Sequence, residues 1–209
     1  MVAAELRERG HEVLSPDLPA ADDSAGLGDY ADTVLEASGD RTDLTVVAQS
    51  MGAFTAPLLC GRADVRRLIL VAPMIPAPGE SPGEWWTSSG QTAAQREQDT
   101  REGRDPDAPF DLRTAFLHDV PEDVVEQLFA RGEPRQSDTP FREPWPLDAW
   151  PDIPTHVLAG SNDRIFPLDF MRRLSQERLN VEPDVIETGH LPALARPKEL
   201  ADRLEAYIA

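Results

Sequence analysis

Short apolar runs alternate with amphipathic segments in the first third and the last quarter of the chain. The runs are rich in aliphatic and β-branched residues, and they predict buried strands at 44–48, 67–71, 156–160 and 184–186. Between them, apolar residues recur at helical spacing, as at 197–208. Strands that alternate with helices are typical of a parallel sheet with helices on both faces, so the sequence predicts an α/β fold.

The start of the chain continues this pattern. An amphipathic segment at 2–9 predicts a helix that ends at Gly10, and the apolar residues of 11–14 predict a strand. A second helix is predicted at 30–38, after a loop of small and acidic residues. These elements add one more strand to the predicted sheet.

The middle of the chain, residues 73–154, has a different composition. It holds all four tryptophans and thirteen of the twenty prolines. Because repeated prolines interrupt long elements, we expect short helices there, among them 112–116 and 121–130. The sequence thus predicts a core of residues 1–72 and 155–209, with 73–154 inserted as a small helical cap.

Charge and composition argue against several function classes. The 209 residues include 38 acidic and 20 basic side chains, a formal net charge of −18, whereas nucleic acids and anionic membranes bind basic patches. The single cysteine, Cys60, cannot form an intrachain disulfide, and the N-terminal residues lack the apolar core of a signal peptide. The histidines are scattered, and no glycine-rich nucleotide loop occurs. We therefore expect a cytoplasmic protein without metal, cofactor, nucleic-acid or membrane partner.

The most informative stretch is 44–59, LTVVAQSMGAFTAPLL, which predicts a strand, a sharp turn and a helix with Ser50 at the apex. Ala48 and Gly52 lie two positions either side of the serine, and small residues there let strand and helix pack closely. Such a turn exposes the serine Oγ and directs a helix N-terminus at it, where developing negative charge is stabilised. Ser50 is therefore a candidate nucleophile; the alternative is a serine that only caps the helix.

Two later residues each follow a predicted strand. Asp163 comes just after 156–160 and His190 just after 184–186, at the sheet edge where open α/β folds build their sites. A serine hydroxyl needs a base, which His190 can supply, and a carboxylate such as Asp163 can hold the imidazole. Each also has a simpler interpretation, because aspartates are frequent in turns and loop histidines often face solvent. Asp169, in the next predicted helix, is the alternative acid.

Three motifs carry a specific resemblance. AQSMGAF, AGSNDRIFP and GHLPALARP resemble the nucleophile elbow, acid loop and histidine loop of the α/β-hydrolase superfamily, and most of all those of small esterases grouped with plant methyl esterases and hydroxynitrile lyases. This resemblance implies a catalytic triad of Ser50, Asp163 and His190. It also implies that the backbone N–H of Met51 is one donor of the oxyanion hole.

The chain departs from that superfamily at its start. The members have a further central strand before the helix at 2–9, followed by a loop that supplies the second oxyanion N–H, whereas here Met1 begins at that helix. The resemblance therefore implies a hydrolase fold shortened at the N-terminus. The strands at 11–14 and 44–48 would then pair directly, or an upstream segment or a partner chain, as in a homo-oligomer, would fill the place between them.

The cap offers candidates for the substrate pocket. His118, Trp85, Trp86 and Trp145 could form its walls, although packing of the tryptophans inside the cap is an equal alternative. We therefore predict a serine hydrolase that cleaves a small, apolar ester through an acyl-enzyme.

Two other functions stay open. One is a lyase similar to hydroxynitrile lyases, but Leu191 occupies the place after the histidine where those enzymes commonly have lysine. The other is a ligand-binding member that has lost turnover, because its oxyanion hole would be incomplete.

Overall fold

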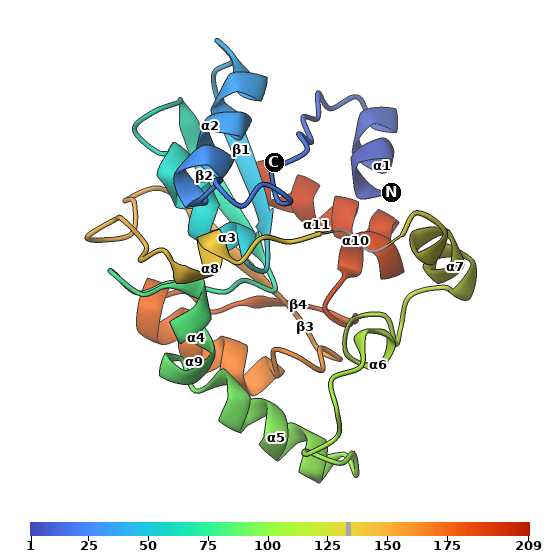
Figure 1. The fold of residues 1–209 in the computed structure, drawn as a ribbon. Helices are drawn as coiled ribbons and strands as arrows, with labels where there is room; N and C mark the ends of the chain where they lie inside the picture. Colours follow the sequence, from blue (N-terminus) through green and yellow to red (C-terminus); the bar gives the residue numbers. More distant parts are fainter. Residues whose placement is uncertain (133–134) are drawn as a thin grey trace.

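The computed structural model describes residues 1–132 and 135–209, and a parallel sheet forms their centre (Figure 1). The four strands lie in the order β1-β2-β3-β4, and each pairs in parallel with the next. They are β1 (Leu44–Gln49), β2 (Val65–Val71), β3 (Thr155–Gly160) and β4 (Asp184–Ile186). The predicted α/β class and these four strands are confirmed.

Side chains alternate between the two faces of the sheet, as the pleat requires. Leu68 and Leu70 enter the larger hydrophobic cluster on one face, whereas Ile69 and Val71 enter a smaller cluster on the other. Helices that contribute to the first cluster are α2 (Leu27–Ser38), α3 (Gly52–Thr55), the 3-10 helix η1 (Ala56–Leu59), α4 (Pro82–Ser88) and α9 (Leu168–Leu179). Helices on the second face are α1 (Val2–Glu8) and α11 (Pro197–Ile208). The predicted covering of both faces is thus confirmed.

The helices of the middle segment are mostly short, as the prolines predict: α4 has seven residues, α6 (Leu112–Phe116) five, α7 (Glu122–Ala130) nine and α8 (Thr139–Arg142) four. The longer α5 (Gln91–Arg101) has 11 residues and no proline, and α10 (Pro192–Ala195) lies in the last part of the chain. Pro57 shortens the α-helix after Ser50, which tightens into 3-10 geometry at Ala56. None of the described helices combines the length and the apolar character that crossing a membrane would need.

The strand predicted at 11–14 is wrong. These residues form no strand, because among the described residues they have no ladder partner. Side-chain contacts hold the segment instead: Arg7 donates to the Val13 carbonyl, and His11 contacts Glu205 of α11. The segment therefore does not pair with β1. Within the described chain β1 is hydrogen-bonded to β2 alone, and Val47 at this edge is 46% exposed.

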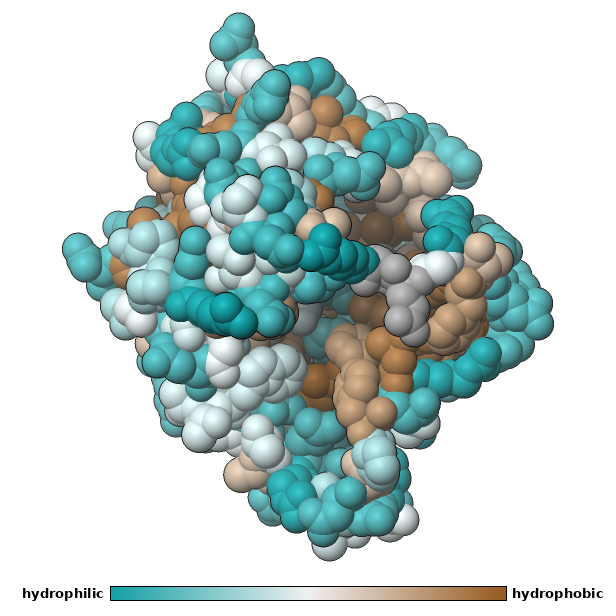
Figure 2. Space-filling view, viewed as in Figure 1, coloured by the Kyte–Doolittle hydropathy of each residue, from teal (hydrophilic) through white to brown (hydrophobic). Residues whose placement is uncertain are grey.

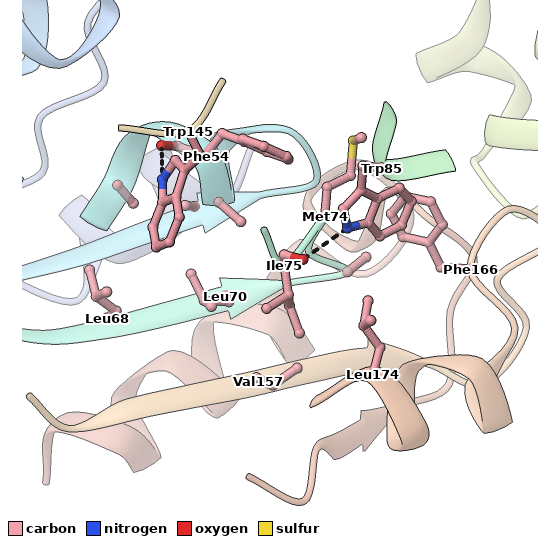
Figure 3. Close-up of a cluster of buried hydrophobic side chains, with 14 of the residues drawn as sticks. Phe54, Leu68, Leu70, Met74, Ile75, Trp85, Trp145, Val157, Phe166 and Leu174 are labelled. Carbon is pink, nitrogen blue, oxygen red and sulfur yellow. Dashed lines mark hydrogen bonds between the residues drawn. The ribbon is translucent and has the colours of Figure 1, made fainter. Parts of the chain in front are cut away.

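Two tryptophans of the predicted cap are part of the main core (Figure 3). Trp85 and Trp145 are both fully buried in the larger cluster. The indole N–H of Trp85 donates to the Ile75 carbonyl at 2.9 Å, and that of Trp145 donates to the Phe54 carbonyl at 3.0 Å. These bonds satisfy the only polar atom of each side chain, so both rings pack with the core without an unpaired donor.

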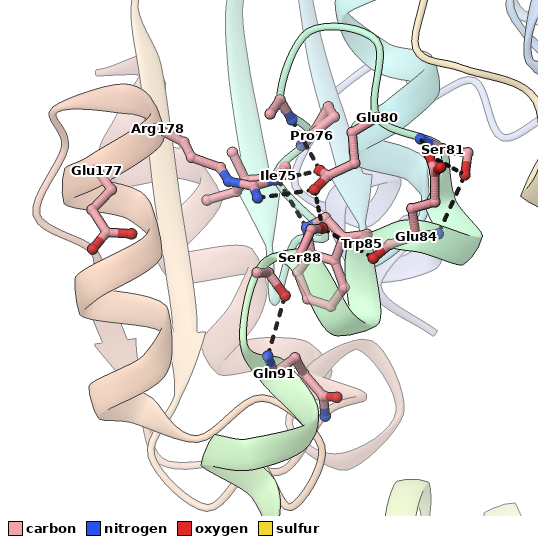
Figure 4. A network of polar contacts seen from close by, with 12 residues as sticks. Ile75, Pro76, Glu80, Ser81, Glu84, Trp85, Ser88, Gln91, Glu177 and Arg178 are labelled. Atoms are coloured by element: carbon pink, nitrogen blue, oxygen red, sulfur yellow. Dashed lines mark hydrogen bonds and ion pairs between the residues drawn. The ribbon is translucent and has the colours of Figure 1, made fainter.

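A buried ion pair fastens the same region to α9 (Figure 4). The Arg178 guanidinium donates to the Glu80 carboxylate at 2.5 and 3.0 Å and also to the Ile75 carbonyl. The carboxylate accepts further bonds from the Ala77 N–H and the Ser88 hydroxyl. Because both charges are largely shielded from water, this network fixes the segment before α4 against the core.

Candidate active site

Ser50 lies in a strained turn at the carboxyl end of β1. Its φ is +51°, in the left-handed region that non-glycine residues rarely adopt. Hydrogen bonds hold the turn: the Ser50 N–H donates to the Val71 carbonyl, and the Ser50 carbonyl accepts from the N–H groups of Ala53 and Met74. These three backbone hydrogen bonds thus fix the conformation of the turn at Ser50.

The small residues beside Ser50 account for the tight turn. A Cβ built on Gly52 would lie 3.5 Å from the Ala48 Cβ, which is ordinary van der Waals contact. Alanine at 48 therefore fits where the usual motif has glycine, provided that position 52 stays small.

His190 and Asp163 form a buried pair. The His190 Nδ1 and Asp163 Oδ2 are 2.8 Å apart, and both residues are 1% exposed. The other carboxylate oxygen, Oδ1, accepts the N–H groups of Ile165 (2.8 Å) and Phe166 (3.0 Å). Because Asp163 Oδ2 accepts from Nδ1, that nitrogen carries the proton of the neutral imidazole. Nε2 of His190 is then free to accept a proton.

The second nitrogen of His190 is available. Nε2 is buried and has no hydrogen-bond partner in the part of the chain that the structure describes. In the described chain, Ser50 Oγ makes no hydrogen bond to His190. Hydrogen bonds between a nucleophile and its base are often long before substrate binds. A side chain of the elbow does reach the histidine: Gln49 Nε2 donates to the His190 carbonyl at 2.7 Å. The elbow and the histidine loop are therefore neighbours.

Aromatic rings surround the imidazole. The centroids of Phe166 and Phe116 lie 4.8 and 5.1 Å from that of His190, both edge to face. Phe110 is 73% exposed, and its ring centroid lies 6.1 Å from that of Phe116. Figure 2 shows apolar side chains gathered over α6 beside a hollow in this face of the molecule. An apolar path thus leads from the surface to the histidine.

The candidate oxyanion donor is the backbone N–H of Met51. Met51 directly precedes α3, and none of the backbone hydrogen bonds recorded for the described turns uses its N–H. The group stands at the start of a helix, where partial positive charge gathers. It is therefore free to bind an oxygen that develops negative charge.

The structure corrects part of the predicted substrate pocket. Trp85 and Trp145 are core residues with no exposed surface to offer a ligand, because their rings fill space between the sheet and the short helices. Trp86 is half-buried and its ring lies 5.9 Å from that of Phe166, which in turn contacts His190. Of the three tryptophans predicted as walls, only Trp86 is partly open to solvent.

His118 lies between α6 and α7, half-buried against the two loops of the site. Burial lowers its pKa below the ordinary 6.5, and the charge of Arg164 lowers the pKa further. Its Nε2 is buried without a partner in the described chain. His118 is therefore neutral at pH 7, and its place as a pocket residue stays a prediction.

Three neighbours of the site were not found from the sequence: Gln49, Phe116 and Asp119. Phe116 is one apolar residue among many in the middle segment. Asp119 is one of many acids, yet its Oδ2 accepts the Gly189 N–H at 2.6 Å. Their contacts depend on how the short helices return to the sheet, and no local motif marks that.

Within the described residues, no group of three His, Cys, Asp or Glu side chains is arranged to hold a metal.

Comparison with known families covers almost the whole chain. Residues 2–203 match the model of a family described as the alpha/beta hydrolase family. No curated protein sequence matches the chain at a significant level.

Three solved structures illustrate the similarity of fold. A pyrethroid hydrolase from Sphingobium faniae is 20% identical, with a TM-score of 0.69 over 99% of this chain and 89% of that one. An extracellular alpha/beta-hydrolase from a Paenibacillus species, described as homologous to tobacco salicylic acid binding protein 2, is 17% identical, with a TM-score of 0.76 over 99% and 91%. Polyneuridine aldehyde esterase is 15% identical, with a TM-score of 0.71 over 100% and 92%. At these identities the similarity establishes the fold.

Proposed function

Because the chain belongs to the alpha/beta hydrolase family, we propose that it hydrolyses a small, apolar carboxylic ester through an acyl-enzyme on Ser50. The observation that carries the proposal is the buried His190–Asp163 pair, whose histidine accepts a hydrogen bond from Gln49, the residue before a serine held at positive φ. Each of the three residues follows the end of a parallel strand, so all three lie at the carboxyl ends of the strands.

The first half of the reaction acylates the serine. Oγ of Ser50 attacks the ester carbonyl carbon while its proton passes to Nε2 of His190, and the charged imidazole is stabilised by Asp163. The carbonyl oxygen becomes an oxyanion that the Met51 N–H can bind. Collapse of this intermediate breaks the carbon–oxygen bond to the alcohol, which leaves with the proton from Nε2.

The second half releases the acid. A water gives a proton to Nε2 and its oxygen attacks the acyl carbon, and the bond to Oγ then breaks as the proton returns to Ser50. Serine, histidine and aspartate end as they began, so the cycle consumes one water and one ester.

The surroundings of the histidine support an apolar substrate. Phe116 and Phe166 are edge to face with His190, and the exposed Phe110 contacts Phe116 at the outer end of the same path. Contact with these side chains would remove apolar surface from water, at about 25 cal/mol for each Å² buried. The relatives of similar fold that are named as a pyrethroid hydrolase and an esterase are consistent with this substrate class.

One observation favours a second candidate, a ligand-binding member without turnover. Among the described residues we identify the Met51 N–H as the one oxyanion donor, and loss of a donor typically slows acyl transfer by about 10²–10³-fold. Such a protein would bind apolar esters in the same place and release them unchanged.

Hydrolysis of p-nitrophenyl acetate and butyrate distinguishes the two. The wild type is expected to release p-nitrophenol with saturation kinetics, and Ser50→Ala is expected to lose that release. Ser24→Ala, which changes an exposed serine far along the chain, is the matched control and should behave as the wild type. Equal rates for Ser50→Ala and the wild type would contradict the proposal.

A further inference from the structure

The main chain around His190 is held by two side chains from different parts of the fold. On one side, Asp119 from the segment between α6 and α7 accepts the N–H of Gly189, the residue just before the histidine, at 2.6 Å. On the other side, the side-chain amide of Gln49 donates to the carbonyl of His190 itself at 2.7 Å. The peptide group before Gly189 is thus tied to the predicted cap, and the peptide group after His190 is tied to the elbow.

Close packing makes the first contact dependent on glycine. A Cβ built on Gly189 would lie only 2.7 Å from Asp119 Oδ1 and 2.7 Å from His118 Nε2. From the sheet side, a Cβ on Gly160 would approach the carbonyls of Thr188 and Gly189 at 2.5 and 2.7 Å. The histidine loop therefore lies between β3 and the α6–α7 segment with no space for a side chain at either glycine.

Hydrophobic contacts support the same junction. Leu117, Val120 and Val125 form a small cluster of their own, and Leu191 and Leu194 from the histidine loop and α10 pack against it. Asp119 lies between the first two of these residues in sequence, so the cluster brings its carboxylate to Gly189. The hydrogen bond between Asp119 and Gly189 is thus flanked by apolar contacts between the same two segments.

The position of the backbone controls the position of Nε2. The Asp163 carboxylate orients the imidazole ring through Nδ1, but it makes no hydrogen bond to the main chain that carries the ring. Gln49 directly precedes Ser50, so one amide joins the peptide of the proposed base to the turn of the proposed nucleophile. A displacement of about 1 Å between reacting groups can cost 10²-fold in rate.

We propose that Gln49 and Asp119 are positioning residues that together hold His190 within reach of Ser50. Neither touches the reacting atoms: both act on the main chain of the histidine. The inference rests on the proposed function of Ser50 and His190, and it adds that the α6–α7 segment is required for the chemical step as well as for enclosing substrate.

The decisive variants at position 119 differ in one acceptor. Asp119→Ala removes the partner of the Gly189 N–H, and we expect kcat to fall about 10–100-fold with KM within about twofold. Asp119→Asn keeps an oxygen that accepts the same N–H and should stay within about threefold of the wild-type kcat. Glu126→Ala, an exposed acid of α7, is the control and should leave kcat unchanged.

Position 49 gives an independent test. Gln49→Met has similar length but no N–H to donate, so we expect a fall in kcat of the same order as for Asp119→Ala. Gln127→Met makes the same replacement on the exposed face of α7 and serves as its control. Rates are expressed per site titrated with a fluorophosphonate, which removes any contribution from inactive protein.

A measurement independent of turnover separates this inference from the proposed function. The His190 Nδ1 proton, shared with Asp163 in a buried hydrogen bond, should give a low-field ¹H NMR signal in the wild type. We expect faster exchange to remove that signal in Asp119→Ala and Gln49→Met, whereas Asp119→Asn retains it. An enzyme inactive in every form with this NMR pattern would contradict the proposed function and support the positioning role.

Three results would overturn the inference. Wild-type kcat and NMR signal in folded Asp119→Ala and Gln49→Met would remove any positioning role. Equal loss in Asp119→Asn and Asp119→Ala would mean that the charge matters rather than the acceptor. Failure of both Asp119→Ala and Gln49→Met to fold would assign the two contacts to stability alone.

Discussion

At the scale of single residues, the site depends on groups held in unusual states. Ser50 keeps a strained backbone, and His190, packed against Phe116 and Phe166, keeps a nitrogen that has no partner among the described residues. Both features cost stability, since strain and buried unpaired polar groups each cost about 1–3 kcal/mol. Their persistence side by side is the residue-scale argument for a chemical role.

Asp163 should be the acid partner, and Asp169 should not. Asp163→Asn removes the ionised acceptor that fixes the imidazole, so we expect kcat to fall by about 10⁴-fold with little change in KM. Asp169→Asn is the matched control: Asp169 is an exposed residue of α9 that pairs with Arg172. Steady-state ester hydrolysis measures both, and a greater loss in Asp169→Asn would reverse the assignment.

His118 should make stability depend on pH. Because burial lowers its pKa below 6.5, the unfolded chain binds a proton at a higher pH than the folded protein does. The free energy of unfolding should therefore fall as pH decreases from about 7 to 5. Urea unfolding across this range should give a smaller slope for His118→Gln than for the wild type.

His156 contributes a slope of the same sign, since burial lowers its pKa too, and it is present in both proteins. An identical slope with and without His118 would contradict the prediction.

The residues of the site differ in how far sequence could identify them. Ser50, Asp163 and His190 each follow a strand that its own composition marks, and their order along the chain adds to the pattern. Gln49 and Asp119 carry no such mark, because their roles arise from contacts across 141 and 70 positions of sequence. Local pattern gives the candidates, whereas the packing of the middle segment gives their supports.

At the scale of elements, prediction succeeded where an element's own pattern was sufficient. The final helix and the strand at 184–186 have the predicted bounds. The segment 11–14 has strand-like composition yet forms none, because a strand also needs a neighbour to bond with. Trp85 and Trp145 of the middle segment lie in the core, because core helices and proline-rich loops contribute to one hydrophobic cluster.

The junction of α9 with the segment before α4 should depend on the Glu80–Arg178 pair. Glu80→Ala leaves a guanidinium that is 15% exposed without its carboxylate, and we expect a loss of about 3–5 kcal/mol in unfolding free energy. The double variant Glu80→Gln with Arg178→Met should lose less, because it removes both charges.

Urea unfolding of the single and double variants gives the coupling energy directly. Glu177→Ala, which removes an exposed pair with Arg173 on the same helix, should change stability little. Additive effects of the two buried changes would contradict the account of this junction.

At the scale of the whole molecule, strand β1 leaves part of one edge of the sheet exposed to solvent. Val47 faces the same side as the α1 and α11 cluster but remains 46% exposed at the edge of β1. An exposed apolar strand edge can pair with another chain, and the net charge of −18 opposes such contact by repulsion.

Salt should therefore promote association through β1. We expect light scattering of the wild type to rise as ionic strength increases, since screening weakens the repulsion. Val47→Lys should suppress that rise by placing a charge on the edge, whereas Leu14→Lys, at an exposed leucine outside the sheet, should not. Equal association of all three proteins would show that β1 is not the contact.

The central claim is that Ser50 is an activated nucleophile, and intact-mass analysis after treatment with a fluorophosphonate tests it most directly. The phosphonyl group bonds to Oγ and releases fluoride only where a base removes the hydroxyl proton, so no knowledge of the substrate is needed. We predict one adduct on the wild type and none on Ser50→Ala. A folded wild type that gains no adduct, or a Ser50→Ala protein that gains one, would contradict the account.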